Sequence, residues 1–170
     1  VMDVPAKYLF LAHSRPEHWM RWFGPVGYPV TTCEADFRVG GKWRMIMTGP
    51  DGKEGPPFGG TYLEIVPYTR IIYDDAFEDG KGGEMNLKTT GKMVFTTTFD
   101  EQGGKTTVTT TVLFPTIEMK AEYLGVGMLE GIGSGFDQLE AVARDLACRC
   151  GNSPSRIAHR PAAIATPSAQ

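Results

Sequence analysis

The chain has 170 residues, of which 41% are hydrophobic, and its 17 Lys and Arg against 20 Asp and Glu give a formal net charge of −3. This length predicts one globular domain, and the charge balance provides no basic surface for phosphates, so we expect no nucleic-acid partner. No apolar run reaches the 18 residues that a membrane-spanning helix needs. The first residues also lack a basic segment followed by an apolar one, which argues against a secretory signal.

The three cysteines are an odd and sparse set: Cys33, Cys148 and Cys150. Such a set argues against a disulfide framework and predicts a reducing compartment, so we expect the protein in the cytoplasm. The three histidines lack the spacing and flanking ligands of a zinc site. We therefore expect neither a metal nor a cofactor.

Two short helices are predicted between Pro5 and Phe23. Apolar residues recur there at roughly helical spacing, interrupted at Ser14–Pro16. Pro16 fits the first turn of a second helix, and Glu17 is favourable beside the positive end of its dipole.

Six strands are predicted between residues 31 and 114, where short β-rich runs alternate with turn residues. Their ranges are Thr31–Phe37, Lys42–Met47, Gly60–Val66, Arg70–Phe77, Lys88–Phe99 and Lys105–Phe114. The short connections between them imply an antiparallel meander. Alternation places Trp43, Met45 and Met47 on one apolar face, with the opposite face largely polar.

One long amphipathic helix is predicted toward the C-terminal end of the domain. Its apolar stripe steps by four, three, four and three residues: Ile132, Phe136, Leu139, Ala143 and Leu146. Residues 1–150 are expected to form the single domain. Residues 151–170 are rich in Pro, Ala, Ser and Thr, which predicts a flexible tail.

The aromatic and methionine side chains of the predicted sheet suit a deformable apolar pocket and a plain packed core equally well. Composition alone favours the core. Glu64 lies between Leu63 and Ile65 in a predicted strand. Its side chain has two comparable possibilities, an inward position that needs a polar partner and an outward position on the wet face.

Several stretches carry a resemblance to a known superfamily. They include Pro5-Ala6, Ser14–Trp19, Trp22–Pro25, Asp36–Arg44, Gly60–Pro67, Arg70–Tyr73 and Phe136–Glu140. In this order they resemble the SRPBCC superfamily, which contains the START domains and the birch pollen allergen. The branch they resemble is that of the bacterial homologues of the heat-shock-chaperone ATPase activator.

The resemblance implies an α+β helix-grip fold, in which a curved antiparallel sheet with two short helices wraps the long C-terminal helix. It also implies a cavity between the sheet and that helix. Members of the superfamily usually have a whole strand before the Pro5-Ala6 motif, whereas only Val1–Val4 precede it here. We therefore expect a truncated first strand and an exposed sheet edge, which would allow a homodimer.

The leading functional expectation is that the cavity binds a small hydrophobic or aromatic molecule. The residues expected to line it are Trp22, Trp43, Met45, Tyr62, Tyr73, Phe95, Met128, Ile132 and Phe136, with Glu64 orienting a polar group of the ligand. One alternative is an enzyme, a hydrolase or cyclase, that would need a titratable group in the same cavity: Glu64, Asp74 or His13. Another is a chaperone-associated interaction protein, by analogy with the activators.

Overall fold

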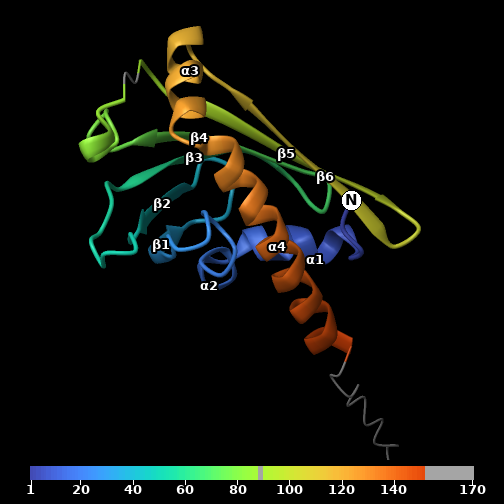
Figure 1. The fold of residues 1–170 in the computed structure, drawn as a ribbon. Coiled ribbons are helices and arrows are strands. Elements are labelled where there is room, and N and C mark those ends of the chain that lie inside the picture. Colours follow the sequence, from blue (N-terminus) through green and yellow to red (C-terminus); the bar gives the residue numbers. More distant parts are fainter. Residues whose placement is uncertain (88–89, 152–170) are drawn as a thin grey trace, which may run out of the picture.

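The computed structural model describes residues 1–87 and 90–151 and consists of one curved sheet with helices on its inner face (Figure 1). The strands are β1 (Val30–Ala35), β2 (Lys42–Met47), β3 (Phe58–Val66), β4 (Arg70–Phe77), β5 (Met93–Gln102) and β6 (Lys105–Leu113). The helices are α1 (Ala6–Ser14), α2 (Pro16–Trp19), α3 (Ile117–Gly125) and α4 (Met128–Gly151), and η1 (Gly83–Met85) is a short 3-10 turn. The predicted tail lies outside the described residues, apart from Gly151.

The predicted meander is confirmed, because the six strands are neighbours in chain order and pair antiparallel throughout. β2 and β4 have the predicted bounds. The predicted start of β5 at Lys88 lies outside the described residues; the strand begins at Met93, two residues after Gly91, which has a positive φ of 125°. Directly after β4, the Asp79 carboxylate accepts the backbone N–H groups of Lys81, Gly82 and Gly83 and holds this turn.

Local backbone geometry and one side-chain cap mark where the helices begin and end. The break between α1 and α2 falls at Arg15, which has extended backbone, and Pro16 occupies the first turn of α2 as predicted. The C-terminal helical region is two helices rather than one. α3 begins after Thr116, whose hydroxyl accepts the N–H of Met119 at 3.1 Å, and α4 follows Gly127, which has a φ of 85°.

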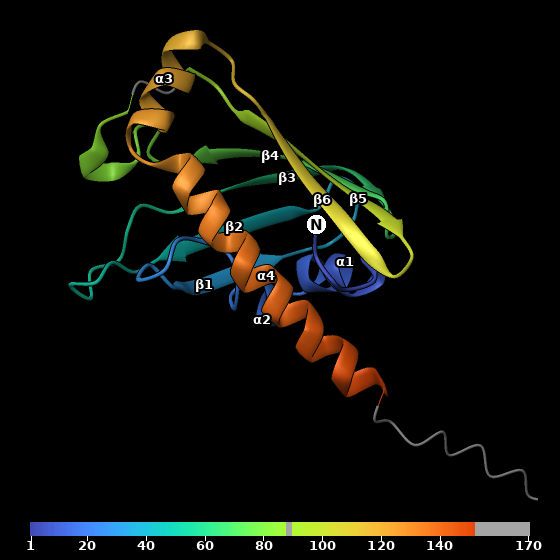
Figure 2. The same ribbon diagram turned by 45° about the vertical axis from the view of Figure 1, so that its right-hand side comes forward.

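The sheet curls around α4, which crosses its inner face diagonally in both ribbon views (Figures 1 and 2). α1 and α2 cover one end of the inner face, and α3 stands over the other end. The backbone of α4 approaches mainly α1, and to a smaller extent α3. Among the described residues, no helix is both long and apolar enough to cross a bilayer.

The interior at the α1 end of the sheet is filled by aromatic side chains. Trp19 of α2 is 1% exposed, and its ring centroid lies 5.3 Å from that of Trp43, 6.0 Å from Tyr73 and 6.3 Å from Tyr62. Large aromatic rings supply much of the buried apolar area that stabilises a fold. This end is therefore a packed core.

The N-terminal residues attach to the sheet at the β5–β6 turn end, where the Ala6 N–H also donates to the Glu101 carboxylate. Met2 and Thr106 exchange backbone hydrogen bonds of 2.8 and 2.9 Å, and the Thr106 hydroxyl donates to the Val4 carbonyl at 2.7 Å. Beyond Thr106, the described residues pair with Thr107–Leu113 of β6 on the β5 side only. The outer side of this strand is an open edge in the described part of the chain.

Candidate functional site

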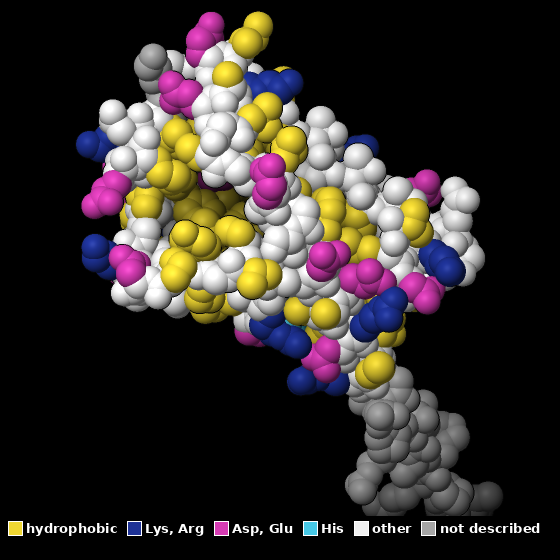
Figure 3. Space-filling view, in the orientation of Figure 1, with side chains coloured by type: hydrophobic (Ala, Val, Ile, Leu, Met, Phe, Trp, Pro, Cys, Tyr) yellow, Lys and Arg dark blue, Asp and Glu magenta, His cyan; other side chains and the backbone are white. Residues whose placement is uncertain are grey.

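An apolar hollow opens on the inner face of the sheet, beside the first half of α4 and below α3 (Figure 3). Apolar side chains from α4, β2 and β4 are only partly buried although they belong to the interior-facing stripes: Met128, Ile132, Phe136, Met47 and Phe77. A close-packed interior would bury such side chains almost completely. This end of the inner face is therefore less tightly filled than the α1 end.

The strand residues predicted to line a cavity are brought together on the inner face. Tyr62 pairs with Tyr73, which in turn pairs with Phe95, and the rings of Tyr73 and Phe95 stack at 5.2 Å. Trp43 and Met45 share this face. All five are less than 10% exposed, so they form the packed layer from which the hollow opens.

Trp22 belongs to the contact between helices. Its indole N–H donates to the Ala12 carbonyl of α1 at 2.9 Å, and its ring lies 4.5 Å from the His13 ring. Gly135 of α4 approaches the same tryptophan closely. Unlike the strand residues, Trp22 therefore anchors α1 and α4 to each other.

The inward position considered for Glu64 is wrong. β3 has an irregularity between Tyr62 and Glu64, after which Glu64 pairs with Ile72, a residue on the face opposite to that of Tyr73. Its carboxylate accepts a hydrogen bond of 2.5 Å from Arg70 Nε, and both side chains remain about 40% exposed. Glu64 is therefore an outward, paired carboxylate that does not face the hollow.

The other two candidate titratable groups also lie outside the hollow. His13 is a buried residue of α1, and desolvation lowers its pKa to about 4 against the opposing effect of its hydrogen bond with the Leu9 carbonyl. Asp74 faces outward, accepts the Thr61 N–H at 2.7 Å and pairs with Lys92 at 3.1 Å. Both therefore have structural partners of their own.

The close approach of β4 to β3 depends on a glycine. A side chain at Gly60 would place its Cβ 1.9 Å from the Asp74 carbonyl oxygen, so only glycine fits there. The same carbonyl accepts the Trp43 indole N–H at 3.1 Å. These contacts fix the backbone of β4 at Asp74, the residue that precedes Asp75.

Asp75 is the titratable group that sequence reasoning missed. It pairs with Met93 on the inner face, is 8% exposed, and its Oδ1 has no hydrogen-bond partner among the described residues. Burial raises its pKa to about 7, the negative charge of Asp74 adds to the rise, and Lys92 opposes it. The signal was present, because the period of two that turns Tyr73 inward also turns Asp75 inward.

Tyr123 of α3 lies over the same end of β4. Its ring stacks on Phe77 at 6.3 Å and packs against Phe114 at 5.9 Å, and its hydroxyl has no hydrogen-bond partner among the described residues. Burial, followed by the charges of Asp75 and Asp79, raises the pKa of Tyr123 to about 12. Asp75 and Tyr123 therefore place two unpaired polar groups in an apolar setting.

Two further buried polar atoms have no partner in the described residues: Trp19 Nε1 of α2 and Tyr62 Oη of β3. Both belong to neutral groups, whose burial costs less free energy than that of a carboxylate. Within residues 1–87 and 90–151, no cluster of three or more His, Cys, Asp or Glu side chains could hold a metal ion. The distinctive chemistry of the inner face is therefore the Asp75 carboxyl.

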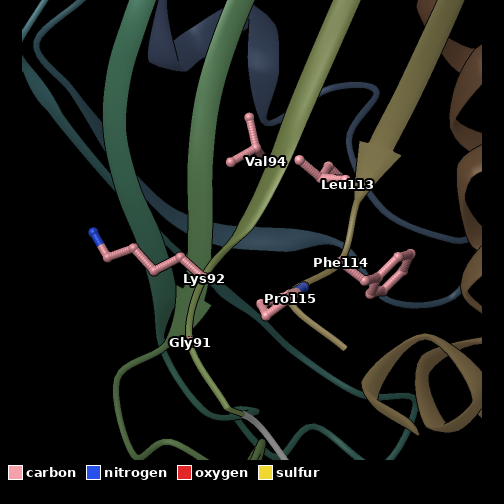
Figure 4. A pocket seen from close by; sticks show the side chains of 6 residues that line it. All are labelled: Gly91, Lys92, Val94, Leu113, Phe114 and Pro115. Atoms are coloured by element: carbon pink, nitrogen blue, oxygen red, sulfur yellow. The ribbon is translucent and has the colours of Figure 1, made fainter. Parts of the chain in front are cut away.

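Two open grooves lie outside this face, along the edge of the sheet. One, of about 440 Å³, is lined by Gly91, Lys92, Val94, Leu113, Phe114 and Pro115 (Figure 4). The other, of about 340 Å³, shares Leu113, Phe114 and Pro115 with the first. Neither is lined by a buried carboxyl group, so the inner hollow is the stronger candidate for a specific site.

Comparison with solved structures supports the fold. A protein of Nitrosomonas europaea has a TM-score of 0.73 at 22% identity, with 86% of this chain and 92% of that chain covered. A protein of Arthrobacter aurescens has a TM-score of 0.74 at 26% identity over 94% of this chain and 88% of that chain. An AHSA1-like protein of Aeromonas hydrophila has a TM-score of 0.62 at 19% identity, with 86% and 89% covered.

No curated protein matches the chain at a significant level. The family model described as "Activator of Hsp90 ATPase homolog 1-like protein" matches residues 3–144, which is most of the chain and includes the whole sheet. The helix-grip architecture agrees with this match. The chain therefore belongs to the activator-of-Hsp90-ATPase-homologue-1-like family, a branch of the SRPBCC superfamily.

Proposed function

We propose that this protein binds a small hydrophobic or aromatic molecule in the hollow between the inner face of the sheet and α4. The observation that carries the proposal is the partial burial of Met128, Ile132 and Phe136, which project from an amphipathic helix toward an apolar face. Ligand sites are concave, mostly apolar and supplied with a few polar groups. The hollow has each of these features.

The packed layer next to the hollow suits an aromatic ligand. Tyr73 and Phe95 stack on each other, and the Phe77 ring stacks on that of Tyr123 at the α3 end. Met47 and Met128 add flexible, polarisable side chains that adapt to ligand shape. An apolar ligand would remove this partly exposed surface from water, which favours binding by about 25 cal/mol per Å².

A fluorescent probe tests this proposal. N-phenyl-1-naphthylamine is uncharged and brightens in apolar sites, so we expect saturable enhancement with the protein and displacement by 1-methylnaphthalene. Replacing Ile132 by Trp fills the space beside α4 and should weaken probe binding at least tenfold. A tenfold loss corresponds to about 1.4 kcal/mol.

Leu129 provides the matched control because it lies on the same helix and is 63% exposed. The Leu129→Trp variant adds the same side chain outside the hollow and should bind the probe like the unmodified protein. Absence of saturable binding, or equal loss in the two variants, would contradict the proposed site.

A further inference from the structure

We propose that the hollow selects molecules that carry a hydrogen-bond donor, a hydroxyl or an ammonium group, on an aromatic or other apolar body, and that Asp75 accepts the donor. This inference rests on the proposed function and specifies the chemistry of its ligand. The basis is the Asp75 carboxyl group, which lies on the inner face of the sheet. Its Oδ1 has no hydrogen-bond partner among the described residues.

Asp75 is buried without full compensation by the fold. A carboxyl that is 8% exposed and has an unpaired oxygen carries a desolvation cost that the fold itself leaves uncompensated. Carboxyl groups perturbed in this way are concentrated at binding and catalytic sites. A ligand donor at Oδ1 would supply the missing hydrogen bond and recover part of that cost.

The surroundings of Asp75 favour a donor over an acceptor. On its own strand and face it lies between Tyr73 and Phe77, and its cross-strand neighbour is Met93. Lys92, the cation that acts on it, is held by Asp74 at 3.1 Å on the other face. The negative character of Asp75 is therefore available to a ligand.

Tyr123 would help to orient the ligand, because its ring and hydroxyl lie at the same end of the hollow as Asp75. Its ring stacks on Phe77, and its unpaired hydroxyl belongs to the same end of β4 as Asp75. The apolar body of the ligand would extend from Asp75 along the hollow toward Ile132 and Met128 of α4. An anionic head group would instead meet the charge of Asp75 and be rejected, which gives the site its selectivity.

Four naphthalenes with one shared body test the inference by displacement of N-phenyl-1-naphthylamine at pH 8. They are 1-naphthylmethylamine, 1-naphthalenemethanol, 1-methylnaphthalene and 1-naphthoate. We expect the amine and the alcohol to bind at least tenfold more tightly than the methyl compound, because hydrogen bonds to charged groups are the strong ones. The carboxylate should bind most weakly.

Two substitutions separate the possible head groups. Asp75→Leu should abolish the preference for both donors while leaving 1-methylnaphthalene binding within about twofold. Asp75→Asn keeps an acceptor but no charge, so it should remove the advantage of the amine and retain part of that of the alcohol. Glu64→Gln, which changes an outward carboxylate of β3 that is paired with Arg70, should leave all four affinities unchanged.

The outcomes distinguish this inference from the proposed function. If none of the four compounds displaces the probe, the binding proposal itself fails. Equal affinities for all four, or a donor preference that survives in Asp75→Leu, would overturn the role of Asp75 and leave apolar binding intact.

Discussion

The two ends of the inner face are built from similar residues but differ in how completely they are filled. At the α1 end, Trp19 and Leu9 are at most 1% exposed, and His13 has the Leu9 carbonyl as its partner. At the α3 end, Phe77 and Ile132 are only partly buried, and Asp75 has an unpaired oxygen. The α1 end of the inner face is thus filled by the protein's own side chains. The α3 end has partly exposed apolar side chains and an unpaired carboxyl oxygen that a ligand could contact.

The two buried titratable groups mark this difference. Burial lowers the pKa of His13 to about 4, so the ring is neutral near pH 7 and behaves as a core side chain. Burial raises the pKa of Asp75 to about 7, so this group changes charge in the physiological range. The neutral His13 ring is thus typical of a packed core, whereas a buried carboxyl that titrates near pH 7 is typical of a functional site.

The largest expected effect comes from the packed end. Trp19→Ala removes an indole that contacts Trp43, Tyr62 and Tyr73, and large aromatic truncations of this kind cost about 3–5 kcal/mol. Phe77→Ala, at the α3 end, should cost less because this ring is only partly buried. Urea unfolding of the two variants compares the ends directly, and equal losses would show that both are equally packed.

Asp75→Asn is expected to stabilise the folded protein, whereas most substitutions of buried residues destabilise it. The pKa of Asp75 is about 7 in the folded protein against an ordinary value of 3.8, so the folded state binds more protons between these values. Stability therefore falls as pH rises from about 4 to about 7, by up to about 4 kcal/mol. Asp75→Asn should be more stable than the unmodified protein at pH 8, by part or all of this amount.

The advantage of Asp75→Asn should nearly disappear at pH 3.5, where the carboxyl is protonated in the folded state and mostly protonated in the unfolded state. Urea unfolding at the two pH values measures this difference. Glu64→Gln is the control: it weakens a half-exposed outward pair with Arg70 and should not stabilise the protein at pH 8. A destabilised Asp75→Asn at pH 8 would show that this carboxylate is satisfied in the folded chain.

Alternation along the strands predicted most of the fold and part of the site. The inward faces of β2, β4 and β5 follow from the period of two, as the burial of Trp43, Tyr73 and Phe95 confirms. The outward position of Glu64 could not be predicted, because the irregularity in β3 after Tyr62 reverses the alternation of inward and outward side chains. Nothing in the residue pattern indicates this irregularity. Asp75 was predictable from Tyr73 by the same period.

The helices and the filling of the interior were harder to predict. The separate helix α3 depends on the cap at Thr116 and on the left-handed backbone of Gly127, two local features in a segment with weak amphipathic periodicity. Which aromatic residues fill the core and which leave a hollow depends on where Trp19 packs. That position comes from tertiary contacts across the whole sheet, which spacing along the chain does not contain.

The third prediction concerns His13 and has the opposite pH dependence. Its folded pKa of about 4 lies below its ordinary value of 6.5, so the unfolded state binds more protons between them. Stability is therefore lost as pH falls from about 6.5 to about 4, by up to about 3 kcal/mol. His13→Phe keeps a ring beside Trp22 and Phe99 and should remove this loss. Thermal unfolding between pH 4 and 7 measures it, and an unchanged pH profile would contradict the buried neutral ring.

The smallest expected effect lies on the outer side of α4. Gly133 is exposed within the helix, and a Cβ there would meet no atom within 4 Å. Gly133→Ala should raise the free energy of unfolding by about 0.5–1 kcal/mol through helix propensity alone, without changing probe binding. Chemical denaturation checks the first expectation, and weakened probe binding would show that this position also faces the ligand.

Methyl NMR with 1-naphthalenemethanol as the ligand tests the difference between the two ends most directly. Saturable shifts are expected for the methyl groups of Met47, Met128 and Ile132 beside the hollow. Those of Leu9 in the packed core and Leu113 at the sheet edge should stay unchanged. Shifts confined to Leu113, or an absence of saturable shifts beside α4, would contradict the account.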